Sequence, residues 1–211
     1  MTTPSLPKTA QSEANRSAAL RDLLRTRQRL LVLTHHNPDP DSLGGAIGLM
    51  EFARLACGME AKLAITGRVL RAENQAMVRE LGVEMDRLDT IKLSDFDCVA
   101  LVDTQPGFGH TFVPAGTNVD VVVDHHVCDD SKLDPDVTAF VDVRPDIGAT
   151  STIVASYLMH AGVEPSARAA TALHYGIRTD TADLSRNVSD LDVQVVDFLS
   201  HYIDRQALAA I

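Results

Sequence analysis

Three short apolar runs in this chain end directly in acidic or histidine residues, and this pattern restricts the possible folds more than any other feature. The runs are 29–34 (RLLVLT), 97–102 (DCVALV) and 119–123 (VDVVV). Their apolar, β-branched composition is typical of strands that are covered on both faces. Strands that alternate with helical patterns predict a three-layer α/β fold, in which a mostly parallel sheet has helices on both faces.

The rest of the chain continues this alternation. A helix is expected to begin at residue 15, after a flexible tail at 1–14 that is rich in Thr, Pro, Ser and Gln. The helix predicted at 42–57 contains three glycines, which indicate the close approach of another backbone. Further strands are predicted at 61–66 and 138–143, and further helices at 73–81, 149–161, 166–177 and 190–202.

Composition limits the class of protein. With 211 residues, 45% of them hydrophobic and 23% charged, the chain is long enough to fold as one globular domain. Its net charge of −10 disfavours binding of long duplex DNA or an anionic membrane through a basic face. The three cysteines form no CxxC pair, and neither a signal peptide nor a long apolar segment is found. We therefore expect a soluble cytoplasmic protein with reduced thiols.

The polar residues that follow the three runs are candidates for a binding site. The first run leads into HHNPDPD at 35–41, the second ends at Asp103, and the third ends in DHH at 124–126. In open α/β sheets ligands bind beyond the carboxyl ends of the strands, where these groups would gather. Their carboxylates would repel one another unless cations are bound. Histidine and carboxylate ligands suit Mn²⁺, Mg²⁺, Fe²⁺ or Co²⁺, and pairs of such ions catalyse phosphoryl transfer.

Simpler interpretations exist for several of these residues. Asp39 and Asp41 alone would also fit a Pro-Asp turn in which carboxylates cap backbone amides. Thr150 and Ser151 precede a predicted helix, so N-capping is sufficient to explain them. His36 lies between potential ligands on the opposite side of an extended segment, and we expect it to have a packing role.

The order of these motifs resembles the DHH phosphoesterase family. The matching segments are 35–41, Asp103, 124–126 and a fourth at 175–181 (YGIRTDT), and the resemblance covers about residues 29–205. The family includes RecJ-type exonucleases, oligoribonucleases that also hydrolyse 3′-phosphoadenosine 5′-phosphate, cyclic dinucleotide phosphodiesterases and family II pyrophosphatases. It implies a DHH-type domain at 15–187 and a connector helix region at 188–211.

The resemblance also implies a set of ligands for two divalent ions, with Mn²⁺ as the first choice and Mg²⁺ or Co²⁺ as alternatives. Asp103 would bridge the two ions. One ion would also bind His35 and Asp39, and the other Asp41, His125 and Asp180.

Four further residues have implied roles in catalysis or substrate binding. His126 would contact the substrate phosphate or protonate the leaving group, and Asp124 would orient an imidazole. Arg178 and Arg186 flank the fourth motif and would contact phosphate.

The sequence also departs from the family pattern. Pro40 stands where many relatives have glycine between two acidic residues. Full-length relatives continue through a connecting helix into a C-terminal substrate-binding domain with a Gly-rich, His-containing motif, and this sequence has no such segment. Self-association, or a partner that supplies the second domain, is therefore expected. Val195, Val196, Phe198 and Leu199 would be exposed without that domain.

The predicted function is a dinuclear metal-dependent hydrolase that cleaves phosphoester bonds of small nucleotides or very short oligonucleotides through a metal-bound water. Two alternatives stay open. One is a pyrophosphatase-like phosphoanhydride hydrolase, and the other is a metal- or nucleotide-binding module without turnover.

Overall fold

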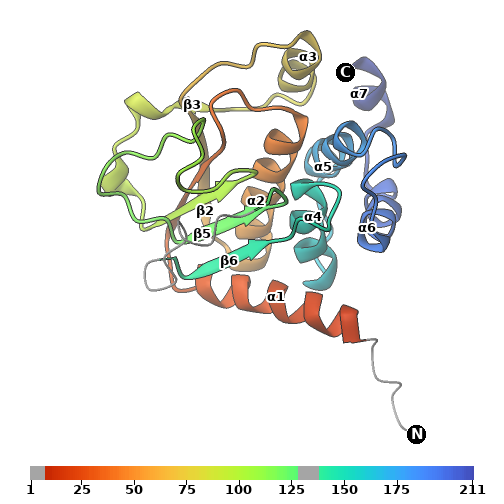
Figure 1. Cartoon of the computed structure of the whole chain (residues 1–211), viewed down its shortest axis with the longest axis horizontal. Helices are drawn as coiled ribbons and strands as arrows, with labels where there is room; N and C mark the ends of the chain where they lie inside the picture. The colour runs from red at the N-terminus through yellow and green to blue at the C-terminus, as the bar shows by residue number, and fades with distance from the viewer. Residues whose placement is uncertain (1–7, 128–137) are drawn as a thin grey trace, which may run out of the picture.

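The structure is a computed structural model that describes residues 8–127 and 138–211. Within these residues six strands form one parallel sheet (Figure 1). The strands are β1 (Arg29–Leu33), β2 (Glu60–Ile65), β3 (Asp86–Arg87), β4 (Cys98–Val102), β5 (Val121–Asp124) and β6 (Phe140–Val143), and their order in the sheet is β3-β2-β1-β4-β5-β6. Five of the six correspond to strands expected from the sequence. The strand β3 has only two residues, which is too short for an apolar pattern to be recognised in the sequence.

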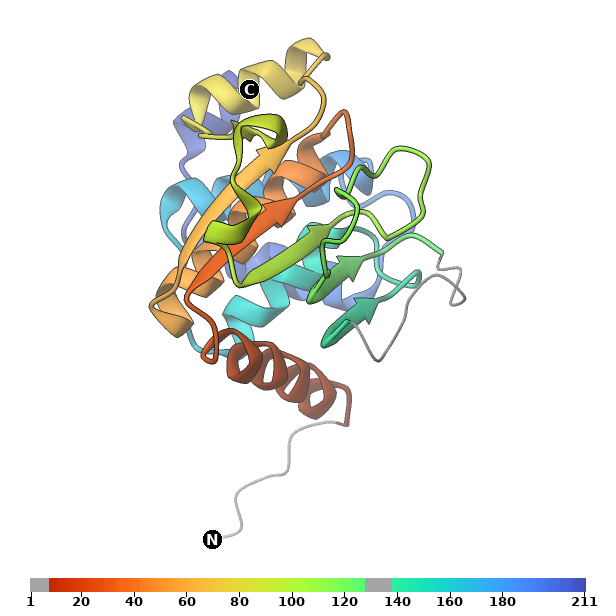
Figure 2. The same ribbon diagram turned by 90° about the vertical axis from the view of Figure 1, so that its left-hand side faces the viewer.

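The parallel register determines where the site lies. Leu33 of β1 pairs with Leu101 of β4, and Val102 pairs with Val123 of β5, so these three central strands end at nearly the same level. The polar residues that follow them therefore meet at one edge of the sheet, as Figure 2 shows for the ends of the strands.

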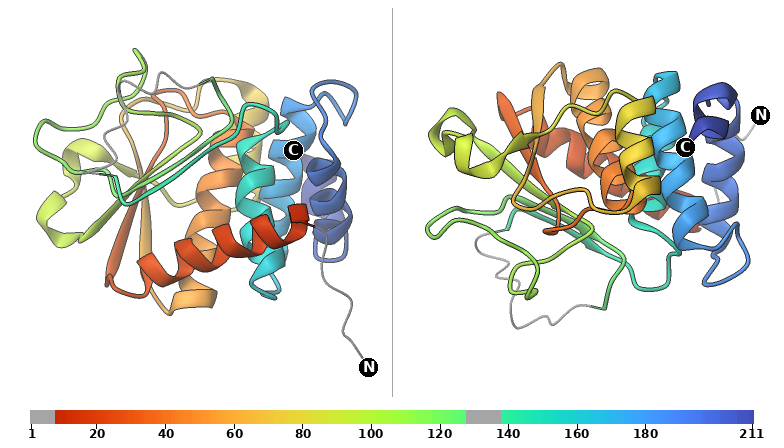
Figure 3. Two further views of the ribbon diagram at one scale, coloured as in Figure 1. Left: turned by 60° about the horizontal axis from the view of Figure 1, so that its bottom comes forward. Right: turned by 90° about the horizontal axis from the view of Figure 1, so that it is seen from above.

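The α-helices lie on one side of the sheet, in two tiers (Figure 3). Helices α1 (Lys8–Leu24), α2 (Pro40–Cys57) and α4 (Thr150–His160) contact strands. Helices α5 (Ala167–Asp180) and α6 (Asp190–Ser200) pack against α2 and α4. The remaining helices are α3 (Ala72–Glu80) and α7 (Arg205–Ala210). None of the helices in the described ranges is long and apolar enough to cross a membrane.

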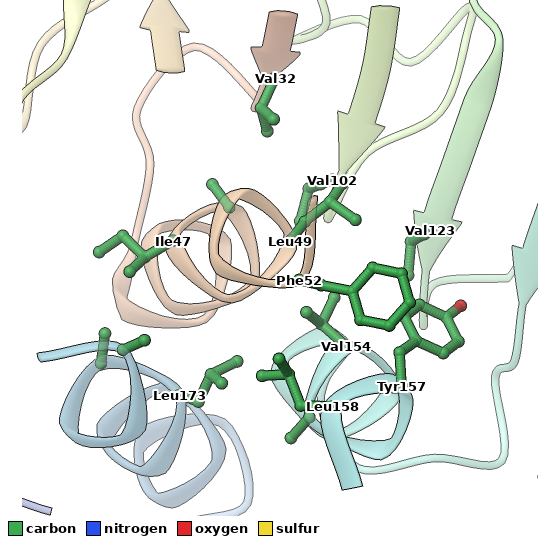
Figure 4. Packing of buried hydrophobic residues seen from close by; sticks show 14 of the residues in the cluster. Val32, Ile47, Leu49, Phe52, Val102, Val123, Val154, Tyr157, Leu158 and Leu173 are labelled. Atoms are coloured by element: carbon green, nitrogen blue, oxygen red, sulfur yellow. The ribbon is translucent and has the colours of Figure 1, made fainter. Parts of the chain in front are cut away.

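The main hydrophobic core fills the space between the sheet and these helices. Figure 4 shows Val102 and Val123 from the sheet, Phe52 from α2 and Tyr157 from α4 packed together, and all four are fully buried. Alternate strand residues point to this side, as the strand period of two requires.

The second face of the sheet is covered differently. Two short 3-10 helices, η1 (Leu88–Thr90) and η2 (Leu93–Asp95), pack there over a smaller cluster that includes Leu31 and Leu101. The expected three-layer arrangement is thus confirmed, with long helices on one face and short helical turns and loops on the other. These turns have no extended apolar period and could not be predicted from the sequence pattern.

Helix α1 differs from the expected boundary. It begins at Lys8, so residues 8–14 of the predicted tail are helical, and residues 1–7 lie outside the described part. Tertiary contacts extend the helix in this direction. Glu13 accepts hydrogen bonds from the Arg144 guanidinium at 2.7 Å, and the Ser17 hydroxyl donates to the carbonyl of Tyr157 at 2.8 Å.

Helix α6 corrects a second expectation. Val195 and Leu199, expected to be exposed, are fully buried against the core, and Val196 and Phe198 are partly buried on it. The helix docks on α4 and α5 of its own chain. Cys57 and Cys98 are free thiols, whereas Cys128 lies outside the described residues.

Close packing of α2 on α5 depends on glycine. A Cβ atom on Gly44 would lie 2.7 Å from the carbonyl oxygen of Ala172, and one on Gly176 would lie 2.8 Å from that of Pro40. The glycines expected to mark a close backbone approach therefore do so. This contact holds the start of α2 beside the end of α5.

We expect Gly44→Ala to destabilise the protein by about 1–3 kcal/mol, because the new methyl group would displace a backbone carbonyl. The free energy of unfolding from urea titration measures this effect. Gly109→Ala is the matched control, since a Cβ atom there meets open space and the loss should be close to zero. Equal stability of the two variants would contradict the packing argument.

Candidate metal centre

Six side chains from four separate segments of the chain meet at the carboxyl edge of the sheet. His35 Nε2 lies 3.7 Å from Asp103 Oδ2, and His125 Nε2 lies 3.3 Å from Asp180 Oδ2 and 3.8 Å from Asp103 Oδ1. In each of three groups the ligand atoms lie within 4.8 Å of one another. The groups are His35–Asp39–Asp103, Asp41–His125–Asp180 and Asp103–His125–His126. All six ligands implied by the family resemblance are thus brought together.

Local structure fixes the position of each acidic group. Asp39 is the N-cap of α2 and accepts a hydrogen bond from the Ser42 amide at 3.0 Å, and Asp41 lies in the first turn. Pro40 between them occupies the first position of the helix, where a missing amide donor has no cost. Asp180 ends α5. Asp103 follows β4 with φ of 59°, a left-handed conformation that aspartate tolerates better than most residues.

The start of α4 holds the two most buried carboxylates among the six clustered residues. Asp41 accepts the amide hydrogens of Thr150 and Ser151, each at 2.8 Å. Asp103 accepts hydrogen bonds from the hydroxyls of Thr150 at 2.9 Å and Ser42 at 2.5 Å. These donors, together with the positive end of the helix dipole, partly compensate for the burial of negative charge.

The compensation is incomplete. Burial raises the pKa of Asp103 well above its usual value, and the neighbouring Asp41 and Asp39 raise it further. Burial likewise raises the pKa of Asp41 to about 6 and that of Asp180 above its usual value. The pKa of His35 is lowered, mainly by burial, which favours the neutral imidazole that binds metals.

These features fit divalent ions. The cluster offers carboxylate oxygens and neutral imidazole nitrogens without a thiolate, which suits Mn²⁺, Mg²⁺, Fe²⁺ or Co²⁺. Asp103 belongs to two of the three groups, one with His35 and Asp39 and one with His125 and His126. Bound cations would neutralise the carboxylates whose pKa values burial raises.

Asp124 and His126 form a pair beside this cluster. His126 Nδ1 lies 2.8 Å from Asp124 Oδ1, and Gln105 donates a second hydrogen bond to Asp124 at 2.7 Å. Although burial raises the pKa of Asp124, the hydrogen bonds from His126 and Gln105 outweigh it and the net shift is downward. The hydrogen bond to Asp124 in turn raises the pKa of His126, whose side chain is half exposed. Asp124 therefore orients the His126 ring and favours its protonated form.

The two arginines are less closely associated with the cluster. Arg186 Nε donates to the backbone carbonyl of Asp180 at 3.3 Å, whereas Arg178 Nε pairs with Asp183 at 2.5 Å. Phosphate binding by either residue stays a prediction. His36 has the expected packing role: its ring contacts Phe112, and its Nδ1 lies 3.2 Å from the Thr66 hydroxyl.

Sequence reasoning missed the residues that hold the predicted ligands and Asp124 in place. Ser42, Gln105 and Thr150 are ordinary polar residues whose partners lie far away in the sequence. Capping alone was a sufficient explanation for Thr150, yet the structure shows its hydroxyl and amide on two different predicted ligands.

Asp192 on α6 is a further residue of this kind. It is fully buried and accepts hydrogen bonds from the Gly148 amide at 3.0 Å and the Thr152 hydroxyl at 2.5 Å. It also forms a capping box with Ser189 at the start of its own helix. Asp192 thus ties α6 to the helix start that supports Asp41 and Asp103.

We expect Asp103→Asn to stabilise the chelated, metal-free protein at pH 7, because it removes a buried charge while asparagine tolerates the same backbone conformation. A carboxyl whose pKa is raised on folding stabilises the folded state fully below about pH 4, and this contribution is lost as pH rises. The gain in unfolding free energy over wild type should therefore increase by about 1–3 kcal/mol between pH 5 and pH 7. Urea titrations at both pH values test this, and a gap independent of pH would contradict it.

With Mn²⁺ present, we expect wild type to be more stable than Asp103→Asn, because wild type binds the metal more tightly. Asp103→Asn should weaken Mn²⁺ binding at least about 10-fold and reduce the number of bound ions, because the variant lacks the carboxylate that is expected to bridge two ions. Calorimetric titration gives both quantities. Glu84→Gln on the surface is the matched control and should bind Mn²⁺ as wild type does. Undiminished stoichiometry in Asp103→Asn would exclude the bridging role.

Known proteins resemble this chain in sequence and in fold. An uncharacterized protein of Methanocaldococcus jannaschii is 38% identical over 181 residues, which cover 85% of this chain and 36% of that protein. A probable manganese-dependent inorganic pyrophosphatase of Enterococcus faecalis is 29% identical over 154 residues, 72% of this chain and 48% of that protein. The chain thus spans less than half the length of these two relatives.

A solved structure supports the fold. The crystal structure of an exopolyphosphatase-related protein from Bacteroides fragilis has a TM-score of 0.73 at 16% identity, and the match covers 96% of this chain and 61% of that chain. The model of the DHH family, N-terminal domain, matches residues 29–177, the part of the chain that carries the sheet and all but one of the six clustered ligands. The chain belongs to the DHH family, of which it contains the N-terminal domain.

Proposed function

We propose that the protein is a dinuclear metal-dependent hydrolase that cleaves phosphoester bonds in small nucleotides or very short oligonucleotides. The observation that carries this proposal is the convergence of four carboxylates and two imidazoles around Asp103. The four carboxylates carry a charge of −4, which two divalent ions would balance. When bound, such ions supply a positive field for phosphate oxygens and acidify the water that serves as nucleophile.

His126 is the residue proposed to act on the substrate. Asp124 accepts a hydrogen bond from the Nδ1–H group of His126, so Nε2 remains to donate to a phosphoryl oxygen or to the leaving group. The raised pKa of His126 increases the fraction of imidazolium at neutral pH, which suits both roles. The same Asp124 keeps the ring from rotating out of this orientation.

A cavity beside this pair would receive the substrate. It has a volume of about 640 Å³, and its lining includes His125, His126, Ile147, Asn187 and Val188. This volume suits a small ligand. The net charge of −10 agrees with a short substrate rather than with a long nucleic acid.

Phosphoanhydride cleavage is the second candidate. The similarity to a probable manganese-dependent inorganic pyrophosphatase favours it, and the same cluster of ligands would serve that reaction. A protein that binds metal and nucleotide without turnover is the remaining alternative.

Phosphate release from three substrates separates these functions. The substrates are 3′-phosphoadenosine 5′-phosphate, a dinucleotide with a 5′-phosphatase added to release its phosphate, and pyrophosphate, each assayed with Mn²⁺ and with a chelator. We expect Mn²⁺-dependent turnover of the first two. Turnover of pyrophosphate alone would favour the second candidate, and tight binding without any turnover would favour the third.

We expect His126→Ala to lower kcat about 10²–10⁴-fold, the usual contribution of a positioned proton donor, while Mn²⁺ stoichiometry stays unchanged. Steady-state kinetics and calorimetric titration measure the two quantities. His201→Ala, at an exposed position on the far end of α6, is the matched control. Full activity of the His126 variant would remove this residue from the proposed chemistry.

A further inference from the structure

Four aromatic side chains form a rim from the candidate metal centre toward β2. The ring of Phe108 lies 6.3 Å from that of His126 and 5.6 Å from that of His110, which in turn lies 5.5 Å from the His35 ring. The ring of Phe112 lies 5.2 Å from that of His36. We call this set the aromatic rim: His36, Phe108, His110 and Phe112.

The rim is held firmly against the first ligand segment. The His36 amide donates to the His110 carbonyl at 2.9 Å, so the loop after β4 is pinned beside His35. The His36 ring bonds Thr66, and a Cβ atom on Gly67 would lie 1.8 Å from the His36 carbonyl oxygen. Only glycine allows this approach, which places the end of β2 directly against the rim.

A cavity of about 460 Å³ opens at the far end of the rim. Ile65, Leu88 and Val113 provide aliphatic walls, and Phe112, whose side chain is 52% exposed, provides an aromatic one. Thr66 lines this cavity and also contacts the His36 ring. His36 is the neighbour of His35 in the sequence, so the cavity wall lies close to this predicted ligand. Arg87, Asp89 and Thr111 also line the cavity, so its wall is mixed. An exposed aromatic ring beside aliphatic walls is a suitable surface for a flat ring.

We propose that the aromatic rim and this cavity bind the nucleobase of the substrate, with Phe112 as the stacking surface. This inference rests on the proposed function, which already names nucleotides as substrates, and adds the place at which this chain would bind the base. The 640 Å³ cavity on the other side of the centre is lined by the imidazoles of His125 and His126, which can donate to phosphate oxygens, and by Asp146 and Asn187, which can bind sugar hydroxyls, so we assign the phosphate and sugar to it. Stacking tolerates any base, so the subsite selects for a base without selecting which one.

Two ligands that differ only in the base test this inference. AMP, a product expected from dinucleotide cleavage, and ribose 5-phosphate are titrated into the Mn²⁺-loaded chain by calorimetry. We expect AMP to bind about 10-fold or more tightly than ribose 5-phosphate. Phe112→Ala should abolish this preference and leave the affinity for ribose 5-phosphate unchanged, whereas Phe112→Tyr should retain it.

Further variants exclude trivial explanations. Phe108→Ala, on the same loop and nearer the centre, should also reduce the preference, and it provides a second test if Phe112→Ala does not fold. Phe96→Ala is the matched control, because this half-buried ring lies near Arg29 at the start of β1, at the opposite end of the sheet. Equal affinity of wild type for the two ligands, absence of binding included, would overturn the inference, as would a preference that survives both rim variants.

The outcomes also separate this inference from the proposed function. A base preference that depends on Phe112, in a protein that releases no phosphate from any substrate, supports the subsite and contradicts the hydrolase. Conversely, a protein that hydrolyses nucleotides but binds AMP and ribose 5-phosphate with equal affinity supports the hydrolase and contradicts the subsite.

Discussion

Repulsion between buried carboxylates is the constraint on which the site depends. Asp41 and Asp103 are almost fully buried and close to further acidic groups, and their pKa values are raised accordingly. A fold that brings such groups together must hold them by other means. Here the start of α4 supplies two amides and one hydroxyl, and Ser42 supplies another hydroxyl. The protein thus keeps its ligands in place by hydrogen bonds and leaves their charge to be balanced by cations.

The architecture around the cluster follows from this requirement. The start of α2 carries Asp39 and Asp41 and must lie beside the end of α5, which carries Asp180. Glycines at the contact between the two helices allow this approach. The parallel register then brings Asp103 to the same edge. Neither helix packing nor strand register alone would assemble the site.

Much of this was predictable from the sequence, because the polar residues follow directly after the strands. Short apolar runs that end in acidic residues indicate both a strand and the edge at which its ligand lies, so five strands and the clustered residues that follow β1, β4 and β5 could be predicted. Asp180 ends a helix, and only the family resemblance implied it. The residues that support them could not. Gln105, Thr150 and Asp192 act through partners that are distant in sequence, and a polar residue on a helix or loop carries no sign of such a partner. The start of α1 and the docking of α6 were misjudged because tertiary contacts decide both.

The link through Asp192 has a mechanical consequence. Its carboxylate joins α6 to the segment 148–152 through hydrogen bonds. Within that segment, Thr150 donates its amide hydrogen to Asp41 and its hydroxyl hydrogen to Asp103. The centre therefore shares its rigidity with the last part of the chain, although α6 contributes none of the six clustered ligands. A tilt of α6 would act through the hydrogen bonds of Asp192 on the segment 148–152, and through the hydrogen bonds of that segment on Asp41 and Asp103. A displacement of α6 would in this way alter the positions of the residues that are predicted to bind metal.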